Sequence, residues 1–385
     1  MGRKEIIIVG GGMVGALSAL LLAQQGFIIH LIEKNKVQIH QQAGDFDLRV
    51  SAFSAQSTRL LQKAGIWNSL PKTRLCAYQC LQTWEKDSAK LTFDSQNLNL
   101  DCLGVMAENS LIQSALWRAL EKMSNVHLYV QCEILTLNNN KNGVCVCLDS
   151  GITIHAYLLI AADGADSLIR QKLNIPITAW DYRQKCLLIS IKTDKSQQST
   201  TWQEFRETGP CAFLPLAGQH ASLVWYHSPE KINQLEDLSV EQLKQVILHE
   251  FPILDFDFEV QKKGGFALTR RHAKNYYQDS CVLVGDAAHS INPLAGQGVN
   301  LGFKDVQCLV DLLVMQNTLE LSDVLKQYEQ KRKVPNMLMQ TAMDVFYKGS
   351  KSQLPSIRLL RKSIFFMAQH SGVLKDTVMK YAMGL

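Results

Sequence analysis

The sequence predicts an α/β fold in which a parallel-sheet nucleotide-binding domain carries an inserted, mainly antiparallel sheet domain and ends in a helical C-terminal region. A strand, a glycine-rich turn and a helix follow one another at the N-terminus. Long strand-like runs with aromatic side chains fill residues 177–276, and a further apolar strand near residue 281 leads into mostly helical sequence. The 385 residues are enough for two closely joined domains.

The first element is the stretch IIIVGGGMVG at residues 6–15. The β-branched residues before the glycines predict a short buried strand, and the Ala- and Leu-rich run after them predicts a helix. Gly10, Gly12 and Gly15 match the Rossmann dinucleotide fingerprint, whose glycines allow a tight turn, close approach of a pyrophosphate and close helix packing. Glycines alone would also fit a turn in another α/β unit. Glu33 ends the second strand near the spacing of a ribose-binding carboxylate, which favours the dinucleotide site.

The composition is that of an ordinary globular protein, with 46% hydrophobic and 19% charged residues. The net charge of +5 is too weak to indicate nucleic-acid binding. The ten scattered cysteines lack the paired spacing of a zinc site, so we expect small apolar side chains in a reducing compartment and no metal. Glu5 and the glycines interrupt the first apolar run, which argues against a signal peptide, and no apolar window is long enough to predict a membrane span. These patterns predict a cytoplasmic protein.

The elements of the first half are short and follow from local pattern. They are predicted in this order: a polar loop ending at Arg49, a helix over 54–65, a strand pair over 76–103, a helix over 108–123 that begins at Asn109, strand-like runs with Asn-Gly and Ser-Gly turns, and a strand that leads to Asp163.

From about residue 177 to 270 the pattern changes to long strands rich in aromatic residues, interrupted by one helix at 239–251. A mainly antiparallel sheet of this kind is suited to form a wall over a flat ligand. The alternative is that its aromatic side chains only fill the core of the sheet. The candidates for the pocket lining are Trp202, Phe205, Phe213, Trp225 and Tyr226.

These changes of pattern predict the domain boundaries. The inserted domain takes residues 76–103 and 177–276, and the helical C-terminal region takes 321–385. The nucleotide-binding domain takes 1–75, 104–176 and 277–320. The stretch 354–385 mixes basic and apolar side chains, so it either lies on a membrane surface or packs on the domain.

Three turns follow buried strands, as ligand-binding turns of an open α/β sheet do: the fingerprint at 10–15, Asp163-Gly164 and Gly285-Asp286. This set resembles the group A FAD-dependent aromatic hydroxylases, whose fold is that of para-hydroxybenzoate hydroxylase. The resemblance implies a Rossmann-like FAD-binding domain and an inserted substrate domain. It also implies these contacts: Gly10, Gly12, Gly15 and Glu33 with the ADP half of FAD, Arg49 with the pyrophosphate, Asn109 or Gln113 with the flavin, Asp163 with FAD and the NADH or NADPH donor, and Gly285 and Asp286 with the ribityl chain.

Several longer blocks narrow the resemblance to the ubiquinone-biosynthesis hydroxylases, along nearly the whole chain: RVSAFS, GPCAFLPL, GDAAHSINPLAGQGVNLG and the terminal KYAMGL. Within this family the chain most resembles the branch that hydroxylates the demethoxy intermediate. The resemblance implies a monooxygenase that uses FAD, NADH or NADPH, and O2 to hydroxylate the ring of a polyprenylated benzoquinol through a flavin C4a-hydroperoxide. The protein partner that it implies is a ubiquinone-biosynthesis protein complex. Where the basic segment 354–385 lies on a membrane and does not pack on the domain, its C-terminal helices would contact the inner face peripherally.

The loop after Asp286 is the candidate for the reactive edge of the flavin, because its amides and the following helix could stabilise negative charge there. His289 is a candidate base, and the alternative is a structural hydrogen bond. Arg270 is a candidate to orient the quinol hydroxyls, and the alternative is a solvated charge. In this loop the candidate catalytic groups are Pro293 and Gly296. The candidate cofactor ligands are the same two residues together with Gln297, Gly298 and Asn300.

Three other functions fit parts of the same pattern. A related hydroxylase could act on another ring position of the same pathway. A non-oxygenating FAD-dependent reductase, similar to geranylgeranyl reductases, would form its product without O2. A noncatalytic prenyl-binding chaperone, resembling GDP-dissociation inhibitors, would purify without the yellow colour of FAD. Dependence on O2 and the presence of flavin separate these functions.

Overall fold

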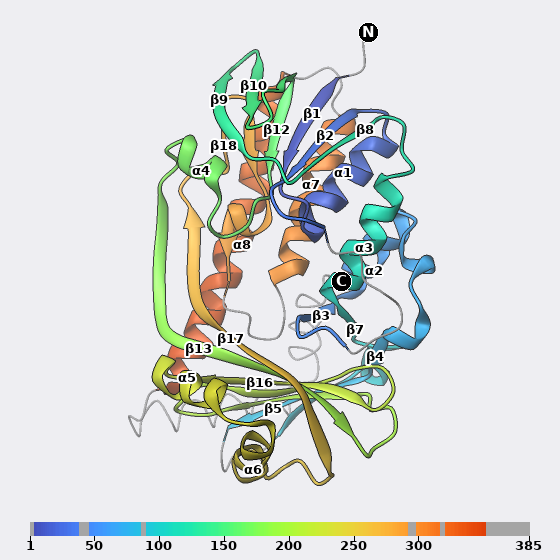
Figure 1. Ribbon diagram of the computed structural model, residues 1–385, viewed down its shortest axis with the longest axis vertical. Coiled ribbons are helices and arrows are strands. Elements are labelled where there is room, and N and C mark those ends of the chain that lie inside the picture. The colour runs from blue at the N-terminus through green and yellow to red at the C-terminus, as the bar shows by residue number, and fades with distance from the viewer. Residues whose placement is uncertain (1–3, 38–45, 86–89, 292–297, 316–319, 352–385) are drawn as a thin grey trace.

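The computed structural model describes residues 4–37, 46–85, 90–291, 298–315 and 320–351. Its architecture is α/β, with a helix-covered parallel sheet at one end and a larger, mainly antiparallel sheet at the other (Figure 1). This arrangement confirms the predicted fold class.

The parallel sheet has six strands, of which only the edge strand β18 runs antiparallel to its neighbour. The side chains of Ile6, Ile7 and Ile8 in the central strand are fully buried, because α1 packs on the sheet and the small sheet that contains β10 and β11 packs against β1 and β12. The strand order is β18 (Tyr277–Gln278), β19 (Cys281–Leu283), β12 (Leu158–Ala161), β1 (Glu5–Val9), β2 (Ile28–Glu33) and β8 (Val126–Val130).

The helices of this end enclose the sheet and each other. α1 is buried along its whole central part and packs against α3 and α7. α2 begins where predicted, because the Ser54 side chain accepts a hydrogen bond from the Ser57 N–H. The helices are α1 (Met13–Gln24), α2 (Ala55–Lys63), α3 (Asn109–Leu120), α4 (Leu168–Lys172), α7 (Gly298–Met315) and α8 (Leu321–Lys351).

The second large sheet has eight strands, and only β14 and β5 pair in parallel. Its two longest strands, β13 and β17, run from the nucleotide-binding end down to the far sheet and join the two parts (Figure 1). The strand order is β20 (His289–Ser290), β17 (Phe258–Ala273), β13 (Ile177–Thr193), β16 (His220–His227), β15 (Cys211–Pro215), β14 (Thr200–Phe205), β5 (Cys80–Glu85) and β6 (Leu91–Asp94).

One face of this sheet is covered by α5 (Pro229–Asp237) and α6 (Val240–Glu250), and α6 lies below the sheet in Figure 1. The sequence predicted only the second of these helices. Ser239 and Gln242 form a capping box at the start of α6, and Ser228 caps α5.

Two small antiparallel sheets complete the fold. The first, β3 (Val50–Phe53), β7 (Gly104–Glu108) and β4 (Cys76–Tyr78), adds a strand where the sequence analysis placed only a loop running into the 54–65 helix. The second consists of β11 (Thr153–Ala156), β10 (Gly143–Leu148) and β9 (Ile134–Asn140).

Three further expectations concern the whole chain. All ten cysteines are free thiols, and four of them, Cys76, Cys186, Cys211 and Cys281, are buried. Within the described part of the chain, no helix has the length and apolar character to cross a membrane. The basic segment 354–385 lies outside the described residues.

Candidate active site

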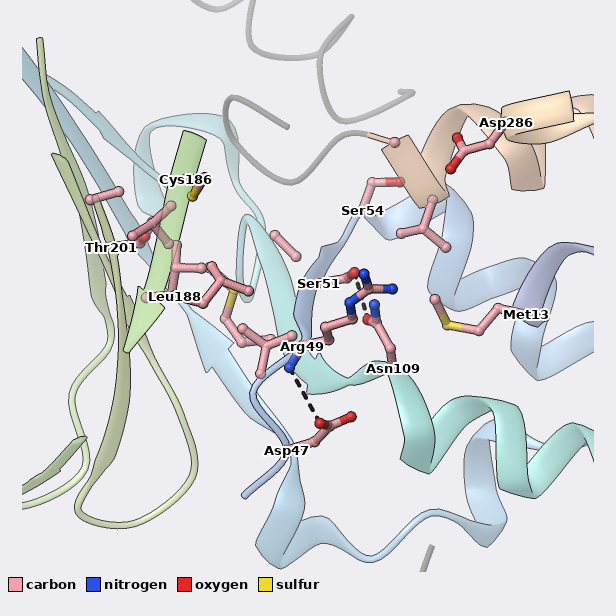
Figure 2. Close-up of a pocket in the computed structure, with 18 of the residues that line it drawn as sticks. Met13, Asp47, Arg49, Ser51, Ser54, Asn109, Cys186, Leu188, Thr201 and Asp286 are labelled. Atoms are coloured by element: carbon pink, nitrogen blue, oxygen red, sulfur yellow. Dashed lines mark hydrogen bonds between the residues drawn. The ribbon is translucent and has the colours of Figure 1, made fainter. Parts of the chain in front are cut away.

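A cavity of about 690 Å³ lies between the fingerprint turn and the eight-stranded sheet. Polar residues line one side, among them Arg49, Asn109 and Asp286. Figure 2 shows Arg49 between Asp286 and the strand that carries Cys186 and Leu188. The cavity therefore joins the two parts of the molecule, where ligand pockets of multidomain enzymes commonly form.

The fingerprint turn is tightly packed except at one position. Gly10 has φ +98°, and a Cβ there would lie 2.4 Å from the Ala162 carbonyl oxygen. A Cβ on Gly15 would lie 1.9 Å from the Gly10 carbonyl oxygen. A Cβ on Gly12 would meet no atom within 4 Å, and Gly12 lines the cavity. The turn thus leaves open space at the glycine that the fingerprint reserves for a pyrophosphate.

Glu33 holds this turn from the neighbouring strand. Its carboxylate accepts hydrogen bonds from the N–H groups of Gly11 (2.6 Å) and Asn35 (2.8 Å). Gln113 and Trp117 of α3 donate to the Gly11 carbonyl oxygen at 2.9 and 2.8 Å. Gln113 also lines the cavity. The structure therefore places Glu33 and Gln113 at the fingerprint, on either side of Gly11.

The segment that carries Arg49 is anchored by a buried ion pair that the sequence analysis missed. Arg74 donates to both carboxylate oxygens of Glu108, at 2.7 and 2.6 Å. Glu108 also accepts the Asp47 N–H at 2.6 Å. Because Arg74 and Glu108 lie far apart in the sequence, no local pattern identifies the pair.

Asn109 connects the same segment to α3. Its N–H donates to the Arg49 carbonyl oxygen (3.0 Å), and its side-chain oxygen accepts the Ser51 hydroxyl (2.7 Å; Figure 2). Arg49 and Asn109 both line the cavity. They therefore lie together at its polar side.

The Gly285-Asp286 turn rests on a fully buried carboxylate, Asp305 of α7. Asp305 accepts the Gly285 N–H (3.1 Å) and lies 2.5 Å from His289 Nε2. Its other oxygen accepts Arg332 Nε (2.7 Å) and the Asn336 amide (3.1 Å), both from α8. Burial alone would raise the pKa of Asp305, but His289 and Arg332 outweigh burial and hold that pKa at about 2.

His289 is held inside this buried network. The ring is 2% exposed, stacks on Tyr276 and does not line the cavity. Its Nε2 is engaged by Asp305. The geometry therefore favours the structural alternative over a catalytic base.

Asp286 and Asp163 have different surroundings. Asp286 is open to the cavity, and desolvation by the cavity walls raises its pKa, while electrostatic interactions with His289 and Arg49 act in the opposite direction. Burial raises the pKa of Asp163, whose Oδ2 accepts the Ile169 N–H at 3.1 Å. Asp163 thus holds the start of α4, and its neighbour Gly164 lines the cavity. Of these two carboxylates, Asp286 is the one that faces the cavity directly.

The sheet wall of the cavity corrects the predicted lining. Phe213 and Trp225 are 1% and 2% exposed and pack in the core under α5 and α6. Trp202 borders the cavity, but its ring stacks on Phe213 at 5.9 Å in that same core. Side chains alternate along a strand, so the neighbours of these aromatics face the cavity instead. The wall consists of Cys186, Leu188, Thr201, Gln203, Ala212, Leu214, Val224, Tyr226 and Phe266.

Arg270 is also displaced from its predicted role. Its guanidinium pairs with Asp344 of α8, which also accepts the Tyr182 hydroxyl. Arg270 does not line the cavity. The ion pair to α8 replaces both the predicted substrate contact and the solvated alternative.

The glycine-rich loop is only partly within the described residues. Pro293, Gly296 and Gln297 lie outside them. Gly298 begins α7 and lines the cavity. Asn300 is buried, and its side chain accepts from Ser54 N–H (3.0 Å) and donates to the Ala52 carbonyl oxygen (2.8 Å). Asn300 thus ties α7 to β3 and α2. Within the described ranges, no group of three or more His, Cys, Asp or Glu side chains could hold a metal ion.

Comparison with known proteins identifies the family. Residues 3–342 match the family model described as FAD binding domain. The chain is 43% identical to 3-demethoxyubiquinol 3-hydroxylase of Escherichia coli, over 99% of this chain and 98% of the relative. The chain belongs to the FAD-dependent ubiquinone-biosynthesis hydroxylases. Within this family it is also 30% identical to the ubiquinone biosynthesis monooxygenase COQ6 of Xenopus tropicalis, over 98% of this chain and 93% of the relative.

Solved structures show the same fold beyond this family. The chain superimposes on PqsL, a probable FAD-dependent monooxygenase from Pseudomonas aeruginosa, with a TM-score of 0.78 and 18% identity, over 95% of this chain and all of PqsL. It also superimposes on the p-nitrophenol 4-monooxygenase PnpA from Pseudomonas putida with a TM-score of 0.77 and 18% identity, over 99% of this chain and 96% of PnpA. At this identity the likeness concerns the fold.

The residues of the hydroxylase's cavity fit FAD. Gly12 leaves open space beside the N-terminus of α1, where backbone N–H groups and the helix dipole favour phosphate. Arg49 offers a positive charge, and Asp286 a carboxylate for hydroxyl groups, on the walls of the same cavity. A dinucleotide with an extended polar chain therefore has suitable groups along this side.

Proposed function

We propose that the protein is an FAD-dependent monooxygenase that uses NADH or NADPH and O2 to hydroxylate the ring of a demethoxyubiquinol-like, polyprenylated benzoquinol. The observation that carries the proposal is the composition of the cavity. One side presents the FAD-compatible groups Gly12, Arg49 and Asp286, and the opposite wall is mostly apolar. An aromatic ring with a lipid tail suits such a wall, and 43% identity to the Escherichia coli demethoxyubiquinol hydroxylase supports the same substrate class.

The cofactor contacts follow from the positions of the side chains. We assign the pyrophosphate to Gly12 and Arg49, the ribityl chain to Asp286, and the ADP half to the turn held by Glu33 and Gln113. When bound, FAD supplies the electron transfer and the oxygen activation. The chain itself binds and orients FAD and the ring, and its apolar wall excludes water from the space between them.

We also infer that the segment 354–385 contacts the membrane surface peripherally. It combines Arg358, Arg361, Lys362 and Lys375 with Leu, Ile, Phe and Met side chains. A basic, amphipathic segment suits the surface of an anionic bilayer, where a polyprenylated substrate resides.

The function is tested with the purified, FAD-loaded protein, NADH or NADPH, a short-tailed demethoxyubiquinol and labelled O2. We expect one labelled oxygen in the ring by mass spectrometry, at the open position next to the methyl group by NMR. Product formed equally well without O2 would overturn the hydroxylase and favour a reductase. Label at another ring carbon would redirect the proposal to another step of the pathway.

Arg49→Met tests the assignment of the pyrophosphate. Loss of a charge-assisted contact to phosphate is expected to weaken FAD binding roughly 10- to 100-fold. The dissociation constant of FAD, measured by fluorescence titration of the protein freed of cofactor, is the readout. Arg59→Met is the control, because Arg59 is an exposed arginine of α2 that does not line the cavity. Equal affinities for Arg49→Met and the unmodified protein would contradict the assignment.

A further inference from the structure

Gln203 is a polar side chain in the otherwise largely apolar wall of the cavity. On β14, Thr201 and Gln203 line the cavity, while the ring of Trp202 packs in the core below the sheet. The cross-strand partner of Gln203 on β15 is Ala212, which also lines the cavity. Around these residues the wall is made of Leu81, Leu188, Leu214, Val224 and Phe266.

The Gln203 amide forms no hydrogen bond with any other described residue, although the residue is only 9% exposed. Its neighbours on the same face of the sheet differ from it. Thr201 donates its hydroxyl to the Phe213 carbonyl oxygen at 2.8 Å. Thr83, the partner of Gln203 on β5, has a hydroxyl that is sealed from the cavity. Gln203 is therefore the polar group of this strand pair that is both open to the cavity and not engaged by the protein.

An amide in this position is costly unless a ligand or water satisfies it. A buried polar group without a partner loses its hydrogen bonds to water on folding, and the apolar neighbours offer no replacement. A glutamine amide can donate and accept at the same time, so it suits a hydroxyl group in either hydrogen-bonding direction. It also carries no charge that an apolar ring and tail would have to desolvate.

We propose that Gln203 hydrogen-bonds one ring hydroxyl of the benzoquinol and thereby sets how the ring lies against the sheet wall. This inference rests on the proposed function and specifies a recognition residue for its substrate. On the side of the cavity that carries the FAD-compatible groups, Arg49 and Asp286 are assigned to the cofactor, and the Asn109 side-chain oxygen already accepts the Ser51 hydroxyl. Gln203 is the recognition group on the opposite wall.

The test compares ligands and variants in the same FAD-loaded, full-length protein. Under anaerobic conditions, the change in flavin absorbance reports the dissociation constants of a short-tailed demethoxyubiquinol and of two analogues, each lacking one ring hydroxyl. We expect the unmodified protein to bind one of the two analogues roughly tenfold more weakly than the quinol. We expect Gln203→Leu to bind that analogue and the quinol about equally. Gln203→Ala is a second variant that also removes the amide, but it leaves empty space where Gln203→Leu places an apolar side chain.

Thr83→Val is the matched control, because it removes a hydroxyl from the same face of the sheet without touching the cavity. It should keep the tenfold discrimination of the unmodified protein. The inference is overturned if both Gln203 variants keep that discrimination, or if Thr83→Val loses it equally. An unmodified protein that carries FAD but binds none of the quinols would instead overturn the proposed function, so the two failures are distinguishable.

Discussion

The Gly15→Ala variant is expected to lose the folded nucleotide-binding domain and, with it, bound FAD. The added Cβ would lie 1.9 Å from the Gly10 carbonyl oxygen and 3.1 Å from the Ala162 side chain. Gly10 has little room to move away, because a Cβ built on it would lie 2.4 Å from the carbonyl oxygen of Ala162, the residue after β12. Overpacking against backbone costs more than overpacking between flexible side chains, so we expect a loss of at least about 3 kcal/mol in the free energy of unfolding. Urea denaturation measures this loss.

Gly12→Ala is the matched control in the same turn. Gly12 has φ −64°, which alanine adopts without strain, and its Cβ would meet no atom within 4 Å. We expect the unfolding free energy of the cofactor-free protein to change by less than about 1 kcal/mol. FAD affinity should nevertheless fall, because the added methyl group occupies the space assigned to the pyrophosphate. If Gly12→Ala unfolded the protein while Gly15→Ala left it intact, this account of the turn would be wrong.

Asp305→Asn is expected to have the second-largest effect. The side chain is fully buried and accepts hydrogen bonds from the Gly285 N–H and the side chains of His289, Arg332 and Asn336. Removing its charge leaves the Arg332 guanidinium, which is 11% exposed, without its counter-charge. Breaking a buried pair in this way costs roughly 3–5 kcal/mol. Denaturation at pH 7 measures the loss, since a pKa of about 2 keeps Asp305 ionised there.

Asp311→Asn provides the comparison on the same helix. Asp311 is 45% exposed, and its nearest cation, Lys63, lies at 3.8 Å. Exposed pairs of this kind contribute at most about 1 kcal/mol, so the unfolding free energy should hardly change. Similar losses for the two variants would show that charge removal from α7, and not the buried network, is responsible.

The parts of the site that the sequence could predict are those encoded by contiguous residues. The strand, turn and helix around Gly10 to Gly15 identify themselves by local pattern, and so does the Gly285-Asp286 turn after a short apolar strand. The family model matches the chain over residues 3–342, in agreement with the FAD site predicted from these turns. Local pattern was sufficient there because each turn is built by its own strand and helix.

Sequence could not assign the faces of the eight-stranded sheet. Thr201, Trp202 and Gln203 are all buried, since the cavity covers one face of β14 and the α5–α6 core covers the other. A strand that is buried on both faces lacks the alternation of polar and apolar residues from which the facing of each side chain is predicted. A pocket lining predicted from aromatic character therefore includes large side chains that belong to the core, such as Phe213 and Trp225.

Long-range pairs were equally inaccessible. The role of His289 depends on Asp305, which α7 brings back to the turn, and on Arg332 from α8. The anchoring of Arg49 depends on the pair between Arg74 and Glu108. None of these contacts follows from spacing along the chain, because each requires two separate elements to pack together.

The position of α8 limits how this protein can exchange parts with its relatives. Met339 and Met343 of this helix line the cavity. Arg332 and Asn336 donate hydrogen bonds to Asp305. Gln340 donates to the carbonyl oxygens of Arg271 and Ser290. A chimera that imports only the sheet domain of another hydroxylase would keep a cavity wall evolved for a different partner. Recombination between relatives should therefore preserve function only when α8 is inherited together with β17 and β20.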